Sequence, residues 1–272
     1  MNDQTSILHQ TLQQMGEVGV LLHRMGAAEG AAGNMSVGFR QAPNFKSLYP
    51  LTQLVKMPFK AEDMAGFGFL ATGSGCRLRD VLASPAVNVG AFVVNPDGET
   101  GTLYTAAEAG FTRLTSEFNT HLAFHRAKLT DESNPVNYLV HAHPPKTTFL
   151  SHLDRYQNVE FLNRHLLRWE PETLYHFPHG IGIASFRAPG TMRLTEETLR
   201  ALSGHEFVIW SRHGAVARSP KSLMHAFDMI EYIETAANYE YLNLTLGEES
   251  GGISVEEILD YAQSAGIQQT VF

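Results

Sequence analysis

The sequence has little of what marks several common classes of protein. Its 272 residues include one cysteine, Cys76, which excludes an intramolecular disulfide and a cysteine-based zinc finger. No apolar run approaches the ~20 residues that a membrane-spanning helix needs. The first six residues show no basic segment followed by an apolar stretch, so we expect no signal peptide and a cytoplasmic location.

Positive charge is also scarce. Twenty Lys and Arg residues against 28 Asp and Glu residues give a formal net charge of −8, which argues against nucleic acid or a membrane surface as a partner. The chain has no P-loop and no Gly-x-Gly-x-x-Gly, so nucleotide binding is disfavoured. An anionic ligand must therefore be held by backbone amides, a metal ion or a few side chains.

The composition indicates a folded α/β protein. Hydrophobic residues make up 43% of the chain and charged residues 18%, which excludes disorder. There is no internal repeat and no linker-like stretch, so we expect a single domain over residues 1–272. Because the predicted strands do not alternate strictly with helices, we expect a central, largely antiparallel sheet covered by helices.

Hydrophobic periodicity and turn residues predict the elements of this fold. Helices are predicted over 7–25, from 115 or 116 to 129, over 195–203, from 219 or 220 onward, and over 255–265. Strands are predicted at 35–39, 67–72, 88–94, 101–105, 136–141, 173–177, 181–185 and 207–210. Residues 41–65 lack clear periodicity and are predicted to form an irregular insertion.

Thirteen histidines are present, and one pair has ligand spacing. His141 and His143 lie at the end of a predicted strand, where residues i and i+2 face the same side. His213 also ends an apolar strand, and Gly214 beside it allows close backbone approach. Three imidazoles from two strand ends would form an open zinc site with a position left for water or substrate.

A second set of possible ligands lies on the helix predicted to end at 129. Glu117, His121 and His125 share one helical face at positions i, i+4 and i+8. They could hold a metal themselves or form a solvated Glu–His face. We favour Glu117 as a carboxylate near the metal and His121 as its support.

Small and hydroxyl-bearing residues offer a site for an anion. Gly73-Ser74-Gly75 follows an apolar strand and suggests a nest of backbone amides. Gly33-Asn34 and Thr115-Ser116 add an amide side chain, hydroxyls and a helix N-terminus. Together they are a means by which an acidic protein can bind phosphate. Trp169-Glu170 before Pro171, by contrast, is typical of a surface turn.

These motifs occur in an order that resembles the class II, zinc-dependent sugar-phosphate aldolases. The resemblance runs from about Gly30 to Ala265, and the motifs that carry it are Gly33-Asn34, Thr72-Gly73-Ser74-Gly75, Thr115-Ser116-Glu117 with His121, His141-Ala142-His143, Trp169-Glu170, Pro189-Gly190-Thr191 and Arg212-His213-Gly214. The Trp-Glu and Pro-Gly-Thr elements point to the branch that cleaves rhamnulose 1-phosphate. The chain departs from that branch at Ala31, where asparagine is usual, and at Pro171-Glu172-Thr173.

The resemblance implies a homotetramer with active sites between subunits and one Zn²⁺ per subunit. It implies that His141, His143 and His213 bind zinc and that Glu117 acts as the acid and base. Glu170 of a neighbouring subunit would act on the hydroxyl at the cleaved bond. The phosphate would be held by the remaining motif residues, which are Gly33, Asn34, Ser74, Gly75, Thr115 and Ser116.

The reaction that the resemblance implies is reversible retro-aldol cleavage of L-rhamnulose 1-phosphate into dihydroxyacetone phosphate and L-lactaldehyde. No lysine stands at a strand end as a Schiff-base candidate, so a Lewis acid is the alternative means of stabilising an enediolate. Other readings are an aldolase for fuculose phosphate, an epimerase for a pentulose phosphate, a zinc hydrolase, or a non-catalytic adducin-like domain. The adducin-like reading predicts loss of metal ligands, whereas the three histidines and Glu117 are present.

Overall fold

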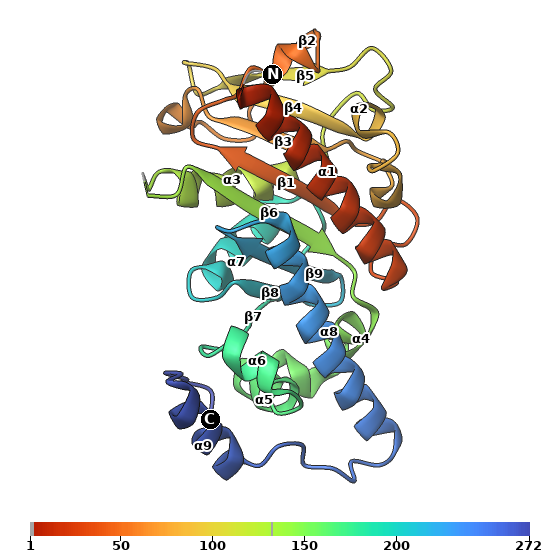
Figure 1. The fold of residues 1–272 in the computed structure, drawn as a ribbon, viewed down its shortest axis with the longest axis vertical. Coiled ribbons are helices and arrows are strands. Elements are labelled where there is room, and N and C mark those ends of the chain that lie inside the picture. The colour runs from red at the N-terminus through yellow and green to blue at the C-terminus, as the bar shows by residue number, and fades with distance from the viewer. Residues whose placement is uncertain (1–2, 132) are drawn as a thin grey trace.

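The computed structural model describes residues 3–131 and 133–272. Its centre is a nine-stranded sheet of order β2-β5-β4-β3-β1-β6-β9-β8-β7 (Figure 1). The β7–β8 pair is parallel and the other neighbouring strands are antiparallel. The α/β class and the largely antiparallel sheet predicted from the sequence are therefore confirmed.

The strands and helices have the following bounds. The strands are β1 (Asn34–Phe39), β2 (Leu51–Lys56), β3 (Gly68–Thr72), β4 (Val89–Val94), β5 (Thr100–Thr105), β6 (Val136–Ala142), β7 (Gly182–Ala184), β8 (Phe207–Trp210) and β9 (Gly214–Ser219). The α-helices are α1 (Asp3–Arg24), α2 (Pro85–Asn88), α3 (Phe118–Leu129), α4 (Pro145–Leu150), α5 (Val159–Leu166), α6 (Pro171–His176), α7 (Met192–Leu202), α8 (Leu223–Thr245) and α9 (Val255–Ala265). Short 3-10 helices span Phe45–Ser47, Glu62–Met64, Leu78–Asp80 and Asp154–Gln157.

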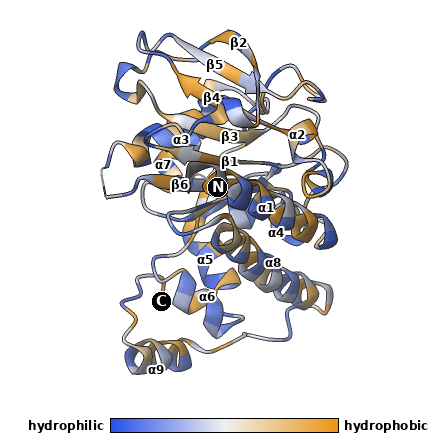
Figure 2. Ribbon diagram, turned by 45° about the horizontal axis from the view of Figure 1, so that its top comes forward, coloured by the Kyte–Doolittle hydropathy of each residue, from blue (hydrophilic) through white to orange (hydrophobic). Residues whose placement is uncertain are grey.

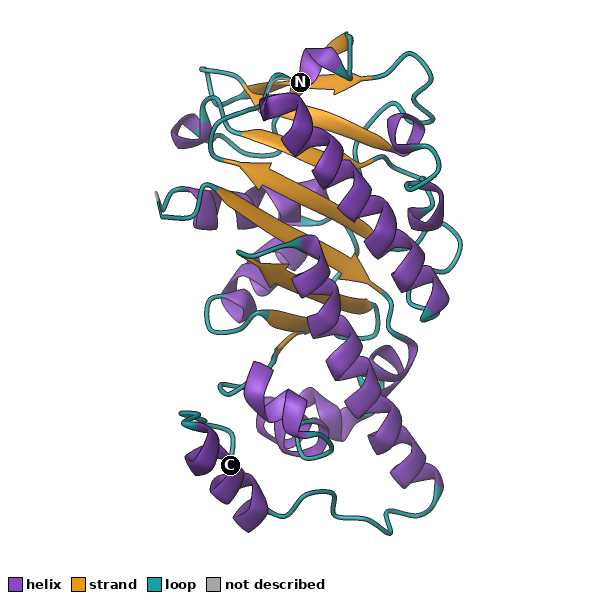
Figure 3. Cartoon of the chain, in the orientation of Figure 1, coloured by secondary structure: helices purple, strands orange, loops and turns teal. Residues whose placement is uncertain are grey.

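Helices cover both faces of the sheet (Figures 1 and 3). On one face α8 packs against α1, β6 and β9, and on the other α3 packs against α7, β1 and β6. Hydrophobic residues are concentrated along the strands, while the helices mix both kinds of residue (Figure 2). The sheet thus separates two apolar layers, as expected when each helix buries one face. In the described part of the chain, no helix has the length and apolarity needed to cross a membrane.

Strand β1 is buried along its whole length, and its two faces differ in character. Met35, Val37 and Phe39 join the main apolar core. Asn34 and Ser36 alternate with them and form hydrogen bonds with side chains of the α3 segment. Because side chains alternate along a strand, one run of sequence supplies both a core face and a polar face.

Four expectations about local structure were wrong. The segment 41–65 contains β2, whose side chains are almost all exposed, so no burial pattern marks it in the sequence. Residues 173–176 are helical and not a strand, because Pro171 begins α6 and holds the first helical position. Helix α3 begins at Phe118 with Glu117 as its N-cap, and no side chain caps it. The long helix near 220 begins only at Leu223.

Candidate functional site

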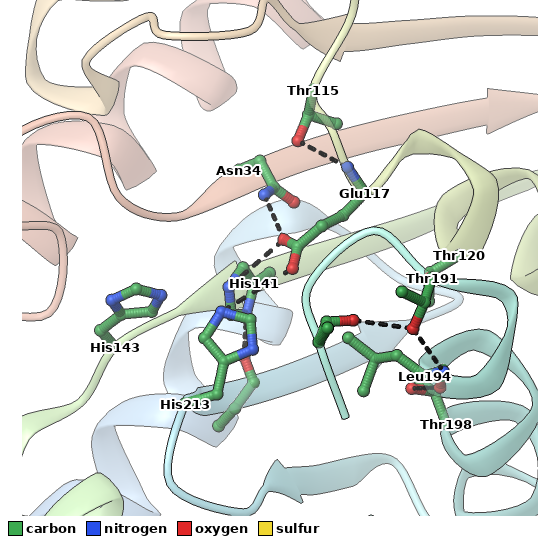
Figure 4. A network of polar contacts seen from close by, with 12 residues as sticks. Asn34, Thr115, Glu117, Thr120, His141, His143, Thr191, Leu194, Thr198 and His213 are labelled. Atoms are coloured by element: carbon green, nitrogen blue, oxygen red, sulfur yellow. Dashed lines mark hydrogen bonds and ion pairs between the residues drawn. The ribbon is translucent and has the colours of Figure 1, made fainter. Parts of the chain in front are cut away.

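The predicted site residues meet in a cavity of about 170 Å³ at one end of the central strands. It lies where β1, β6 and the segment before α3 converge, and Figure 4 shows Glu117 above the histidine rings. The cavity is lined by Ala31, Ala32, Gly33, Asn34, Gly73, Ser74, Gly75, Thr115, Ser116, Glu117, His141, His143, Pro189 and His213. Segments more than 180 positions apart in the chain therefore contribute to one site.

The three histidines predicted from strand ends lie together. His141 is in β6, His143 follows it, and His213 occupies the turn between β8 and β9. One ring nitrogen from each lies within 4.8 Å of the others. Within the described residues they are the one group of histidine, cysteine, aspartate or glutamate side chains that could hold a metal ion.

The backbone around His213 is shaped for this convergence. Arg212 has φ of 62°, a left-handed conformation that is costly for a residue with a Cβ. A Cβ on Gly214 would lie 2.4 Å from the carbonyl oxygen of Ala142 and 2.8 Å from His143 Cδ2. Glycine at 214 is therefore required for β9 to approach the histidine pair, as the sequence suggested.

Second partners fix the orientation of two of the rings. Nδ1 of His141 lies 2.9 Å from the carbonyl oxygen of Ala215, to which it can only donate. Nδ1 of His143 lies 2.8 Å from a carboxylate oxygen of Glu29. Each ring is thus in the Nδ1–H form, and the lone pair of its Nε2 is free for a ligand. Oxygen acceptors behind metal-binding histidines commonly have this role.

Burial keeps His141 and His213 neutral. Desolvation, with a smaller effect of the neighbouring His143, lowers the pKa of His141 to about 3. Desolvation and the proximity of His141 lower the pKa of His213 to about 4. Trp210 packs on both rings, with centroids 4.4 Å from His141 and 5.2 Å from His213. Neutral imidazole is the form that binds a metal ion.

Glu117 faces the histidines from the N-cap position of α3. Its Oε2 accepts a hydrogen bond of 2.8 Å from Nδ2 of Asn34. The same oxygen lies 3.5 Å from Nε2 of His141, and Oε1 lies 3.7 Å from Nε2 of His213. The residue is 3% exposed, and this burial raises the pKa of the carboxyl group against the opposing hydrogen bond from Asn34.

This set of donor atoms fits a divalent cation. Oε1 of Glu117 is buried and, among the residues described, has no hydrogen-bond partner. The other oxygen, Oε2, lies 3.5 Å from Nε2 of His141, which is a lone pair because Nδ1 of that ring carries the proton. Two acceptors therefore face each other here with no hydrogen between them. Three imidazoles and a carboxylate are ligands that Zn²⁺ commonly takes in proteins. The residues present therefore match a metal site.

The residues predicted to bind an anion line the same cavity. Gly75 has φ of 80°, which favours glycine and exposes the backbone of the turn after β3. The hydroxyl oxygen of Thr115 accepts a hydrogen bond of 3.3 Å from the amide of Glu117. Beyond it, the first turn of α3 directs its N-terminus toward the cavity, where a helix favours negative charge.

Comparison with known proteins identifies the fold. Residues 13–241 match the family described as Class II Aldolase and Adducin N-terminal domain. The chain belongs to this family. A rhamnulose-1-phosphate aldolase of Listeria monocytogenes is 27% identical over 261 residues, which cover 94% of this chain and 93% of that protein.

Solved structures support the same family assignment. A sugar-phosphate aldolase from Thermotoga maritima aligns with a TM-score of 0.77 and 27% identity, covering 90% of this chain and 99% of that one. An L-fuculose-1-phosphate aldolase from Thermus thermophilus aligns with a TM-score of 0.54 and 18% identity, covering 89% and 98% of the two chains. The second likeness shows the shared fold alone.

The alternative metal set on α3 does not form in the class II aldolase-family fold. His121 and His125 are fully buried, and both rings contact the hydroxyl of Ser36. Asn34 lies between His121 and Glu117. His121 therefore contacts Glu117 only indirectly, through the amide of Asn34. The sequence analysis did not assign this bridging role to Asn34.

Glu170 is the one predicted site residue outside the cavity. It is the N-cap of α6 and only half-buried. Its neighbour Trp169 donates a hydrogen bond of 2.9 Å to the buried Glu240, which also accepts one of 3.1 Å from Arg168. Trp169 is thus bound to α8, and Glu170 does not line the cavity with the three histidines.

Two residues of the site were missed. Glu29, behind His143, precedes the glycine-rich turn and has no motif of its own. Ser36 belongs to β1, and only its two-residue offset from Asn34 could have placed it on the same face. Ala31 and Pro189, which the sequence marked as a departure and as a family element, both line the cavity.

Proposed function

We propose that this protein cleaves a ketose 1-phosphate by a retro-aldol reaction at the cavity between His141, His143, His213 and Glu117. The observation that carries the proposal is that one small cavity joins a histidine group that could hold a metal ion to glycine turns and hydroxyls suited to phosphate. A zinc hydrolase would account for the histidines but not for the glycine turns and hydroxyls that line the same cavity.

The histidines would hold one Zn²⁺ per subunit through the nitrogens that face Glu117. The ion would supply a Lewis acid that stabilises the negative charge that develops on the ketose as the carbon–carbon bond breaks. The protein's part is to keep His141 and His143 in the Nδ1–H form, through Ala215 and Glu29, so that their Nε2 lone pairs stay available.

Glu117 would transfer the proton at C3 of the ketose. Cleavage removes the proton of the C4 hydroxyl, breaks C3–C4, and leaves the electron pair as an enediolate that must be protonated at C3. A carboxyl group with a raised pKa is suited to giving and taking this proton near neutral pH. Asn34 keeps the carboxylate directed at the reacting atoms through its hydrogen bond.

The phosphate would lie against the turn after β3 and the start of α3. Gly33, Gly75 and their neighbours provide backbone amides, and Ser74, Thr115 and Ser116 provide hydroxyls around one side of the cavity. Asn34 lines the same cavity and contributes its amide. This arrangement matches the acidic composition, because it needs no cluster of lysine or arginine.

Glu170 would act on the C4 hydroxyl from a neighbouring subunit of a homotetramer. Its position outside its own cavity and the firm hold on Trp169 support a role across an interface. A closed ring of identical subunits would supply such a residue to every site.

The substrate that we propose is L-rhamnulose 1-phosphate, with dihydroxyacetone phosphate and L-lactaldehyde as products. Support comes from relatives named rhamnulose-1-phosphate aldolase that are 26–29% identical to this chain. The likeness to an L-fuculose-1-phosphate aldolase keeps fuculose 1-phosphate as a second candidate. An epimerase acting on a pentulose phosphate is a third, because it would use the same bond cleavage.

A product assay on a panel of ketose phosphates tests the proposal. The panel contains rhamnulose 1-phosphate, fuculose 1-phosphate, ribulose 5-phosphate and fructose 1,6-bisphosphate, and dihydroxyacetone phosphate and epimerised sugar are measured separately. We expect the highest kcat/KM for rhamnulose 1-phosphate. Turnover of none of the four by metal-loaded protein would support a non-catalytic, adducin-like domain.

A further inference from the structure

A row of polar side chains lies between β1 and α3, behind Glu117. Asn34, Ser36 and Gly38 occupy one face of the strand, and Glu117, His121 and His125 follow one another along the start and the face of the helix. Two strand residues advance about 6.6 Å and four helical residues about 6 Å. The spacing of these residues along the strand therefore nearly equals their spacing along the helix over three positions. As a result, each of the three strand residues lies opposite residues of the helical segment.

The contacts form one continuous chain. His125 Nε2 lies 2.7 Å from Ser36 Oγ, which lies 2.6 Å from His121 Nδ1. His121 Nε2 lies 2.6 Å from Asn34 Oδ1, and Asn34 Nδ2 lies 2.8 Å from Glu117 Oε2. Ser36, His121 and His125 have no exposed surface, so water does not compete for these bonds.

The direction of every bond in the chain follows from the carboxylate. A carboxylate oxygen only accepts, so the amide of Asn34 presents its NH₂ to Glu117 and its oxygen to His121. His121 must then donate through Nε2. In a neutral ring its Nδ1 is an acceptor, so the Ser36 hydroxyl donates to it, and the hydroxyl oxygen accepts from Nε2–H of His125.

The far end of the chain agrees with this direction. Nδ1 of His125 is buried and has no hydrogen-bond partner among the described residues. With the proton on Nε2, this atom is a lone pair, whose isolation costs less than that of a buried N–H. A Cβ on Gly38 would lie 2.5 Å from the same Nδ1, so glycine leaves the space that this ring fills. Desolvation lowers the pKa of His125 to about 3, in keeping with a neutral ring.

We propose that His121 is a positioning residue that fixes the amide of Asn34 so that its NH₂ group always faces Oε2 of Glu117. Ser36 and His125 fix the tautomer of His121 in turn. The inference rests on the proposed function only in that Glu117 is the group whose position matters. Without the donor on His121, the amide can turn over and place its oxygen against the carboxylate, which would push Glu117 away from the histidines.

Neutron diffraction from crystals of the deuterium-exchanged full chain tests the bond directions without an activity assay. At pH 7 we expect deuterium on Nε2 of His121 and His125, none on Nδ1 of either ring, and the Ser36 deuteron directed at His121. Deuterium on Nδ1 of His121, or an Asn34 amide whose oxygen faces Glu117, would overturn the proposal.

A pair of variants tests the effect on Glu117. In His121→Gln the side-chain amide can still donate from the position of Nε2, whereas in His121→Asn the shorter amide reaches Ser36 and leaves Asn34 without a donor. We expect His121→Gln to retain kcat within a few-fold and His121→Asn to lower it by about 10- to 100-fold. The bound metal per subunit should be that of the unaltered protein in both. A merely structural role predicts equal losses in the two variants.

The two proposals fail in different ways. If the protein cleaves no ketose phosphate, the proposed function is wrong, and the neutron structure still decides whether His121 orients Asn34. If cleavage is observed but the two variants have the same kcat, the function stands and the positioning role of His121 is wrong.

Discussion

Asn34 and His141 are direct partners across the antiparallel β1–β6 ladder, and both approach the same oxygen of Glu117. The amide nitrogen of Asn34 is 2.8 Å from that oxygen and Nε2 of His141 is 3.5 Å from it. Residues paired in this way lie on the same side of a sheet. The register of two central strands therefore sets the distance between the carboxylate and His141.

Removing the ionisable group at position 117 tests its role as acid and base. Glu117→Gln keeps the shape of the side chain and can no longer exchange the proton at C3. We expect kcat to fall by about 10²- to 10⁴-fold, the range typical of general acid–base catalysis, while metal content stays near one ion per subunit. Steady-state kinetics and elemental analysis of the same sample measure both. Unchanged kcat would assign the proton transfer to another group.

The contact between Glu29 and His143 predicts an effect on metal affinity. The carboxylate of Glu29 is 65% exposed, so as a simple surface ion pair it would contribute little. As the acceptor that orients His143, its loss in Glu29→Ala should weaken metal binding by about 10- to 100-fold. Competition with a chromogenic chelator measures the affinity. Glu249→Ala, an exposed glutamate far along the chain, is the control and should leave it unchanged.

Mixed oligomers show whether Glu170 acts across an interface. Glu117→Gln and Glu170→Gln subunits are prepared separately, then unfolded and refolded together in equal amounts. If each site takes Glu117 from one subunit and Glu170 from the next, about a quarter of the sites in random rings are intact, and activity returns to that level. If both residues serve their own subunit, every site has one lesion and activity stays at the level of the separate variants.

The buried histidine at the end of the polar row predicts a pH dependence of stability. The pKa of His125 is about 3 in the folded protein and about 6.5 in the unfolded chain. Between these values the unfolded state binds more protons, so the free energy of unfolding falls as the pH drops below about 6.5, by about 1.4 kcal/mol per pH unit for one such histidine.

His125→Gln removes this titration and should flatten the curve. Urea unfolding at pH 7.5, 6.0 and 5.0 is measured for both proteins under identical metal and salt conditions. Below about pH 6 the free energy of unfolding should fall less per pH unit in the variant than in the unaltered protein. Above pH 7 the two plots of unfolding free energy against pH should run parallel. Parallel curves throughout would mean that His125 is not held neutral by the fold.

Much of this site could be predicted from the sequence because its signals are local. His141 and His143 are two residues apart on one strand, and His213 is followed by the glycine that its turn requires. Both patterns are visible without a structure. The bounds of α9 and of β8 were likewise predicted well.

The errors fall where local pattern and tertiary environment disagree. Strand β2 lies at the sheet edge with exposed side chains, so it has no alternation to detect. The segment from Thr173 has residues that favour strands, yet the proline before it begins a helix. The row of polar side chains between β1 and α3 was missed because it forms only when these two elements pack together. The sequence of each element alone does not indicate that packing.

The most direct test of the account is metal removal and return during cleavage of L-rhamnulose 1-phosphate. The protein is stripped with a chelator, titrated with Zn²⁺, and assayed for dihydroxyacetone phosphate at each step, with His213→Ala treated in parallel. The account predicts that activity disappears on chelation, returns in full at one equivalent per subunit, and does not return in the variant. Full cleavage by metal-free protein, or recovery in His213→Ala at one equivalent, would contradict it.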